Sequence, residues 1–463
     1  GENVIIQSIG ASSGVIVAGA IFTLPALYIL QDKYPEITVN FFEVFMSSLL
    51  GGIIGILLLI PFRKYFVSDM HGKYPFPEAT ATTQVLVSGE KGGSQAKPLI
   101  FAGLIGGLYD FIIATFGWWG ETISTRIVGA GEMLAEKAKI VLKVNTGAAV
   151  LGLGYIIGLK YSLIICAGSF LVWLVIIPAM SAIFSVDVLT FGNDAITATV
   201  GSMSAEQIFT TYARHIGIGG IATAGVIGII NSWGIIKGAV GLAANELKGK
   251  GDAVESNTIR TQKDLSMKVI TIGIIVSLIV TFLFFQFGVL DNWFHSIIAI
   301  LIVFIISFLF TTVAANAIAI VGTNPVSGMT LMTLILASVI MVAVGLNGPS
   351  GMVAALIMGG VVCTALSTAG SFITDLKIGY WLGSTPQKQE TYKFLGVLVS
   401  AATVAGVIMI LNETYGFTSG QLAAPLANAM AAVIEPLMSG AGAPWTLYGI
   451  GALLAIILTW LNV

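Results

Sequence analysis

The chain has 463 residues and a net charge of −2, with 56% hydrophobic and only 10% charged residues, and its mean hydropathy is +0.95. Soluble domains carry about 25% charged residues, so this composition excludes an ordinary soluble enzyme or binding module. The near-neutral charge gives no reason to expect nucleic acid as a partner. We predict an all-α polytopic protein surrounded by a lipid bilayer.

Apolar runs continue along the whole chain, and we expect about twelve of them to form transmembrane or re-entrant helices. A helix needs roughly 20 apolar residues to cross a bilayer. Residues 121–145 differ, because charges alternate there with small apolar residues, which predicts a helix in the membrane interface. The apolar runs cover about 8–30, 41–62, 98–118, 147–159, 161–184, 216–236, 269–290, 296–320, 329–346, 352–372, 392–411, 420–440 (semi-polar) and 446–462.

Six Lys and Arg residues within 237–268 predict a cytoplasmic segment by the positive-inside rule. We therefore divide the chain into a first-half bundle at 1–245, a hydrophilic linker at 246–268 and a second-half bundle at 269–463. Which side of the membrane holds 119–145 stays open. Because residue 1 is Gly and the last apolar run stops at Val463, we expect further N-terminal and C-terminal helices outside this sequence.

An internal repeat is predicted by two similar segments, PEATATTQV at 77–85 and PLANAMAAV at 425–433. Each follows a long apolar run and precedes another. The charge pattern gives the preceding runs, 41–62 and 392–411, opposite directions across the membrane. Opposite directions predict an inverted-topology repeat, a common scaffold for alternating access. Chance similarity between apolar sequences is the alternative.

The sequence GTNPVSGMT at 322–330 separates two apolar runs. Proline removes a backbone donor, glycine loosens the chain, and Asn and Ser add hydrogen-bonding groups. Such a break survives in a membrane only where it is buried in protein or lines a wet cavity, and broken helices commonly hold transporter substrates. We predict that substrate binds at Asn324, Pro325, Ser327, Gly328 and Met329. A plain turn between two helices is the alternative.

A second polar segment, 74–90, has two prolines followed by polar residues. As a re-entrant segment it would present side chains and freed backbone groups to a polar substrate. The alternatives are an amphipathic surface helix here and an ordinary packed helix at its repeat counterpart, 424–440. The further substrate-binding residues that we predict are Glu78, Thr80, Thr82, Gln84 and Asn428.

Ionisable residues at membrane depth are candidates for proton coupling, because burying a charge is costly. Glu78, Asp110 and Glu435 are the three that we predict, and the sequence does not choose among them. Asp375 and Lys377 follow a predicted span, where a charge pair that sets topology is the simplest reading. Three histidines without an H-E-x-x-H motif give no metal site, and no cofactor is expected.

Three motifs resemble the oligopeptide transporter family, in its bacterial branch near the yellow-stripe-like transporters: GTNPVSGMT, KYPFPEATA at 73–81 and DLKIGYWLGSTPQKQ at 375–389. The similarity extends to FTLPALY at 22–28 and YARHIGIGG at 212–220, and so along nearly the whole chain. The resemblance implies a secondary transporter for small peptides or peptide-like metal chelates, driven by protons.

The predicted function is therefore import of small peptides or peptide-like compounds, coupled to protons, by alternating access in the bacterial cytoplasmic membrane. A metal-chelate or siderophore-like substrate and a passive channel are the alternatives. An enzyme is not expected, because no matched catalytic pair or phosphate-binding motif occurs. A homodimer is compatible with this class of protein.

Overall fold

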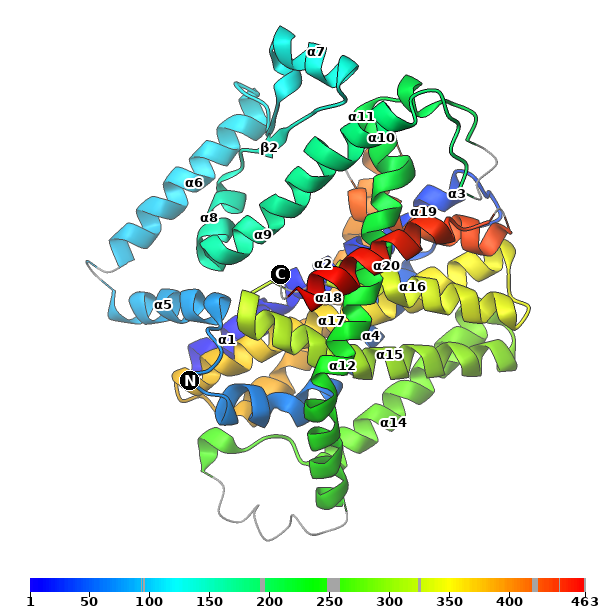
Figure 1. Cartoon of the computed structure of the whole chain (residues 1–463). Helices are drawn as coiled ribbons and strands as arrows, with labels where there is room; N and C mark the ends of the chain where they lie inside the picture. The colour runs from blue at the N-terminus through cyan, green and yellow to red at the C-terminus, as the bar shows by residue number, and fades with distance from the viewer. Residues whose placement is uncertain are drawn as a thin grey trace. The chain divides into compact units, whose positions relative to one another are not determined.

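The computed structural model is almost entirely helical (Figure 1). It describes residues 1–92, 94, 96–191, 196–247, 259–323, 326–418, 424–440 and 442–461, without the side chains at 91, 239–240, 242–247 and 327. Within this part of the chain, nine helical segments are long and apolar enough to cross a membrane, and three shorter apolar helices accompany them. The prediction of an all-α polytopic membrane protein with about twelve apolar segments is confirmed.

The described chain packs as two compact units, which do not follow its two halves. Unit 1 contains Gly1–Ala79, Gly220–Ala443 and Ala452–Val463, and unit 2 contains Thr80–Gly219 and Pro444–Gly451. Three helices continue from one unit into the other: α5 (Pro77–Lys91), α12 (Arg214–Leu247) and α20 (Trp445–Trp460). The division into two half-bundles and a linker stays a prediction.

Unit 1 is built around α17 (Gly348–Trp381), whose apolar stretch is 94% buried. Its neighbours include α2, α4, α15 and α16. The helices of this unit are α1 (Glu2–Gly10), α2 (Ser12–Ile21), α3 (Pro25–Gln31), α4 (Phe41–Arg63), α14 (Met267–Phe284), α15 (Trp293–Val321), α16 (Val326–Ala343), α17, α18 (Pro386–Thr414) and α19 (Pro425–Ser439), with π-helical turns at Lys64–Asp69 and Phe285–Leu290 and a 3-10 turn at Arg260–Gln262.

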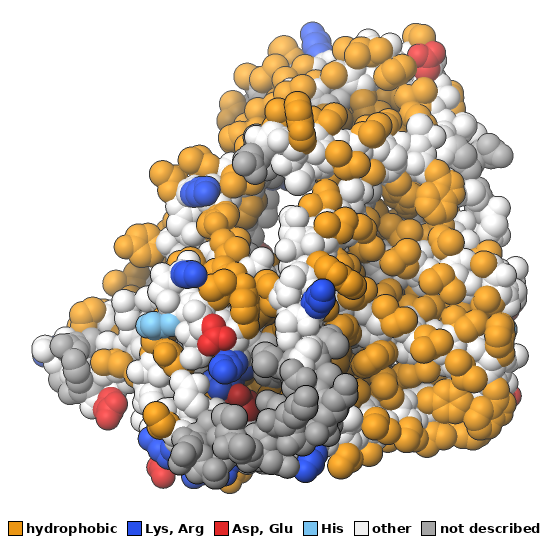
Figure 2. All heavy atoms as spheres, turned by 60° about the horizontal axis from the view of Figure 1, so that its bottom comes forward, with side chains coloured by type: hydrophobic (Ala, Val, Ile, Leu, Met, Phe, Trp, Pro, Cys, Tyr) orange, Lys and Arg blue, Asp and Glu red, His pale blue; other side chains and the backbone are white. Residues whose placement is uncertain are grey.

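Glycines let α4 approach α17 closely, as small residues commonly do between membrane helices. A Cβ atom on Gly51 would collide with the carbonyl oxygen of Val361, and one on Gly55 with that of Ala365. The backbones are therefore in direct contact. On the face that Figure 2 shows, hydrophobic side chains cover broad areas, and charged side chains are sparse, with most of them toward the lower left of the view. Such a surface suits contact with lipid.

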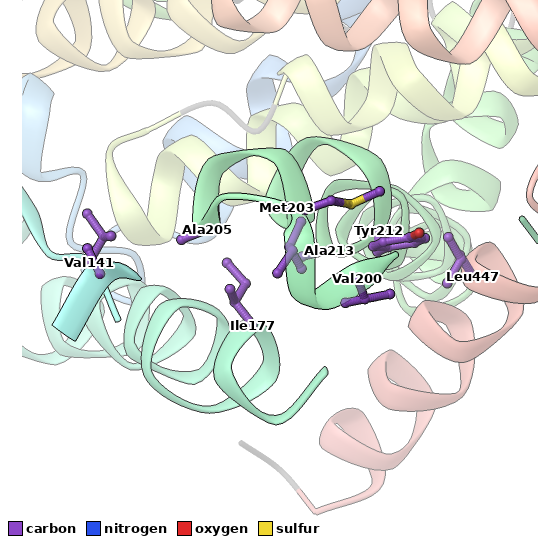
Figure 3. Close-up of a cluster of buried hydrophobic side chains, with 10 residues drawn as sticks. Val141, Ile177, Val200, Met203, Ala205, Tyr212, Ala213 and Leu447 are labelled. Atoms are coloured by element: carbon purple, nitrogen blue, oxygen red, sulfur yellow. The ribbon is translucent and has the colours of Figure 1, made fainter. Parts of the chain in front are cut away.

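Unit 2 has a small core of its own, in which Tyr212 and Ile177 are fully buried (Figure 3). The Tyr212 hydroxyl donates to the Leu189 carbonyl, 2.9 Å away. The elements of this unit are α6 (Ala96–Phe116), β1 (Thr122–Ser124), α7 (Gly129–Lys137), β2 (Lys143–Asn145), α8 (Ala148–Ile157), α9 (Leu159–Phe170), α10 (Ile177–Ile183) and α11 (Ala205–Ile208), with π-helical turns at Leu171–Ile176 and Phe209–Ala213 and 3-10 turns at Thr125–Ile127 and Val200–Ser202.

The prediction of one interfacial helix at 121–145 is wrong. Strands β1 and β2 pair antiparallel, with Ile123 opposite Val144, and only α7 between them is helical. β-branched residues in both strands favour extended backbone. Arg126, between β1 and α7, links α7 to α11, because its guanidinium pairs with Glu132 of α7 and with Glu206 of α11, each at 2.9 Å.

The two segments of the predicted repeat have the same local structure. Both α5 and α19 are 15-residue helices that begin with proline, at Pro77 and Pro425. Proline suits the first position of a helix, because no partner is needed there for its missing N–H. Each lies between two longer helices in the chain, α4 and α6 or α18 and α20. The inverted direction of the two copies stays a prediction.

Candidate functional site

The predicted break is present between α15 and α16. Helix α15 ends at Val321, and Gly322 then takes a left-handed conformation with φ 83° while its N–H donates to the Ile318 carbonyl at 2.9 Å. Helix α16 begins at Val326. Asn324 and Pro325 lie outside the described residues, as does the side chain of Ser327. Gly328 and Met329 are buried in the first turn of α16, where Gly328 packs closely against Ile221 of α12.

The segment before α5 lies against this break. The Phe76 N–H donates to the Ala319 carbonyl at the end of α15, 2.9 Å away. A Cβ atom on Gly322 would lie 2.7 Å from Pro77 Cγ, so the two chains touch. Phe76 is 1% exposed and has a positive φ of 44°, a conformation that non-glycine residues rarely adopt. Two segments that the sequence predicts separately as site components therefore meet in unit 1.

The third motif adjoins the same segment through Lys377 of α17. The Lys377 ammonium donates to the Val67 carbonyl at 2.8 Å and lies 3.1 Å from His71 Nδ1. It also lies over three aromatic rings, with 5.1–5.4 Å from Nζ to the ring centroids of Phe76, Tyr380 and Trp381. Aromatic faces attract a cation. Lys377 is 1% exposed, so these contacts replace much of its hydration.

Asp375, two residues before Lys377 in α17, pairs with a different lysine. Lys393 Nζ of α18 lies 2.7 Å from Asp375 Oδ2, and both side chains are nearly inaccessible. Gln7 and Ser8 of α1 donate to the same carboxylate at 2.9 and 3.3 Å. Asp375 and Lys377 therefore do not pair with each other, and their role in setting topology stays a prediction. Each lies in a separate buried polar cluster, and this difference could not be read from their spacing.

Glu78 is the predicted coupling residue that adjoins these clusters. Its side chain is accessible to solvent, although neighbouring protein atoms partly remove the carboxyl group from water. Partial burial and, to a smaller extent, the charge of Asp375 raise the pKa of Glu78 above its ordinary value of 4.5. A raised pKa allows a carboxyl group to take up and release protons closer to neutral pH. Thr80, Thr82 and Gln84 follow on α5, in unit 2.

The other predicted residues have separate contacts. Asp110 Oδ1 accepts from the Ala148 N–H at 2.9 Å, so it caps the first residue of α8 in unit 2. Glu435 forms a partly exposed ion pair with Lys33 at 2.8 Å. Asn428 Nδ2 donates to the Ala424 carbonyl within α19, also at 2.9 Å. The described contacts do not bring these three to the break, and their roles in transport stay predictions.

Sequence reasoning missed Lys393, Gln7 and Ser8 as members of the Asp375 cluster. Gln7 and Ser8 lie more than 360 residues from Asp375 in the chain, so no local pattern joins them to it. For Lys393 a local signal exists. Its position in the second turn of a long apolar helix was the available clue, because a charge there needs a partner.

The sequence model for the OPT oligopeptide transporter proteins matches residues 1–463. A curated protein of Haemophilus influenzae named "Putative oligopeptide transporter" is 27% identical over 497 aligned positions, which cover 98% of this chain and 74% of the relative. The three motifs quoted above lie within these matches, and the structure brings parts of all three together in unit 1. The chain belongs to the OPT oligopeptide transporter family, a family of multi-pass membrane transporters.

Proposed function

We propose that this protein is a secondary active transporter that imports small peptides or peptide-like compounds together with protons, by alternating access across a bacterial cytoplasmic membrane. The observation that carries the proposal is the meeting of the α15–α16 break, the Phe76–Pro77 turn and the Lys377 cluster in one unit. The family and the name of the Haemophilus influenzae relative support peptides as the substrate class.

The break offers both kinds of charge that a zwitterionic peptide needs. The C-terminal end of α15 carries carbonyl groups and a partial negative charge, while the N-terminal end of α16 carries N–H groups and a partial positive charge. Glu78 follows the turn that touches Gly322. In our proposal the peptide ammonium group faces α15 and Glu78, and its carboxylate faces the start of α16, where Asn324 and Ser327 add polar contacts.

Glu78 is the proton carrier in this proposal. Its raised pKa makes its protonation sensitive to pH above the range of a free glutamate. In the loaded state of the proposal, the protonated carboxyl group accepts a hydrogen bond from the peptide ammonium group through its carbonyl oxygen, so one proton and one peptide cross together. Substrate affinity and proton occupancy are therefore coupled through one carboxyl group.

The decisive experiment places the protein in sealed liposomes with an imposed inward proton gradient and follows a labelled tripeptide. We expect accumulation above the outside concentration, its loss with a protonophore, and its loss in Asn324→Ala. Asn231→Ala, at an exposed asparagine of α12, is the matched control and should transport normally. Normal accumulation in Asn324→Ala would remove the break from the proposed site.

Two alternatives give different results in the same liposomes. A passive channel would let the peptide equilibrate without ever concentrating it. A transporter of metal chelates or siderophore-like complexes would ignore the tripeptide but accumulate a labelled peptide-like chelate under the same gradient.

A further inference from the structure

Residues 259–266, which precede α14, are held by an ion pair and hydrogen bonds at the end of α4 and the start of α18 in unit 1. Arg63, the last residue of α4, pairs through Nε with Asp264, and its Nη2 donates to Asp264 Oδ2 at 2.9 Å. Arg260 donates to the Thr385 hydroxyl at 3.1 Å, just before α18. The Gln387 N–H donates to the Lys263 carbonyl at 2.9 Å. The segment is thus held on both sides.

Glu390 of α18 is the buried centre of these contacts. Its side chain is 0% exposed, and Oε2 accepts from the Leu265 N–H at 2.7 Å. Oε1 is also buried, and no N–H or hydroxyl donor reaches it from the described residues. Leu265 directly follows Asp264 in the chain, and the Asp264 carboxyl group lies beside the Glu390 side chain, within hydrogen-bonding reach. Two carboxyl groups can form a hydrogen bond only when one of them carries a proton.

We propose that Glu390 and Asp264 share one proton, and that this proton holds residues 259–266 against the ends of α4 and α18. With the proton present, the two carboxyl groups carry one negative charge between them, and the positive charge of Arg63 balances it. Without the proton, two carboxylates face one guanidinium, and like charges at this separation repel. The proton would leave through Asp264, whose side chain is 27% exposed.

Among the described residues, the charged groups that face Glu390 are Asp264 and Arg63. Lys393, one turn further along α18, does not neutralise it, because its ammonium is paired with Asp375 at 2.7 Å. Loss of the proton therefore leaves an uncompensated charge, which is relieved when the segment moves away and water enters. Rising pH should release residues 259–266.

The biological meaning of this inference rests on the proposed function. It adds a pH-dependent contact between residues 259–266 and the ends of α4 and α18, which we call the clamp. The positive-inside rule places 237–268 in the cytoplasm, so the clamp would respond to cytoplasmic pH. The tests below need no substrate. Failure of peptide uptake and failure of the clamp are therefore separate results.

The first test follows hydrogen exchange at 259–266 in the full-length protein, at matched pH for the native chain and Glu390→Gln. Glutamine mimics the protonated acid, since it can accept from Leu265 and donate to Asp264. At acidic pH we expect residues 259–266 to exchange equally fast in the two proteins. As pH rises, the ratio of the native exchange rate to that of Glu390→Gln should grow about tenfold per pH unit, because the native segment opens with loss of one proton. Glu413→Gln, at an exposed carboxyl group of the same helix, should behave as the native chain.

The second test is an infrared difference titration, which detects protonated carboxyl groups directly. The native protein should show a carboxylic acid band at neutral pH that both Glu390→Gln and Asp264→Asn remove. Asp264→Asn also tests the clamp independently if Glu390→Gln fails to fold. Identical pH profiles of exchange in the native chain and the variants, or no protonated carboxyl group lost in either, would overturn the proposal.

Discussion

Lys393 and Asp375 form an ion pair that the protein removes almost completely from solvent, with 2.7 Å between Nζ and Oδ2. The Lys393 ammonium also donates to the Ser8 carbonyl at 2.8 Å. The pair therefore ties α1 to both α17 and α18. Because both helices carry parts of the family motif at 375–389, the cluster fixes the geometry of one component of the candidate site.

Breaking this pair should destabilise unit 1. Lys393→Ala leaves the Asp375 charge buried without its cation, a change that costs roughly 3–5 kcal/mol. We expect a lower midpoint of thermal unfolding in detergent, and recovery of part of the loss when Asp375→Asn and Lys393→Met are combined. Lys388→Ala, at an exposed lysine of α18, is the control. Equal unfolding midpoints for Lys393→Ala and Lys388→Ala would contradict a stabilising role.

Lys377 should hold the chain before α5 in place. Lys377→Met keeps the length of the side chain but removes the charge that contacts the Val67 carbonyl and three rings. Charged hydrogen bonds and cation–π contacts together suggest a loss of about 2–4 kcal/mol. We expect faster hydrogen exchange at 64–76 and weaker peptide uptake.

The control for Lys377 is Lys73→Met, at an exposed lysine in the same stretch. Lys377→Arg, which keeps the charge, should fall between the native protein and Lys377→Met. Unchanged exchange at 64–76 in Lys377→Met would show that the backbone there is held by other contacts.

The sequence predicts the apolar helices and the break between α15 and α16, because both depend on local composition. It does not predict that Phe76 donates to Ala319, or that Asp375 pairs with Lys393, because those contacts join distant parts of the chain. The strands at 122–124 and 143–145 escaped prediction for the same reason, since three-residue strands exist only through their mutual pairing. For Glu435 the apolar surrounding sequence predicts a buried carboxyl group, whereas the structure gives it a partly exposed ion pair with the distant Lys33.

Glu78 should make uptake sensitive to pH. Because its pKa is raised by partial burial and by Asp375, the folded protein binds this proton more tightly than the unfolded chain. The stability from the neutral form is therefore complete at low pH and declines as pH rises from the ordinary value of 4.5 through the raised pKa. Because the proposed transport cycle needs the protonated carboxyl group, we expect native peptide uptake to fall as pH rises through this range at a fixed proton gradient. Glu78→Gln should make uptake less dependent on pH.

The matched control is Glu90→Gln, at an exposed glutamate on the same helix. It should retain the native dependence of uptake on pH. A Glu78→Gln profile that superimposes on the native one would transfer the coupling role to another carboxyl group, with Asp110 and Glu435 as the remaining predicted candidates.

Gly322 should tolerate no side chain, for two separable reasons. Its φ of 83° strains any other residue, and a Cβ atom would lie 2.7 Å from Pro77 Cγ. Gly345, at the end of α16, has a similar φ of 87° with nothing within 4 Å of a Cβ atom. Gly345→Ala thus measures backbone strain alone, about 1–3 kcal/mol, whereas Gly322→Ala adds displacement of Pro77. We expect both variants to unfold at lower temperature, but only Gly322→Ala to lose most peptide uptake. Equal uptake by the two would mean that contact between the break and the Pro77 turn is not needed for transport.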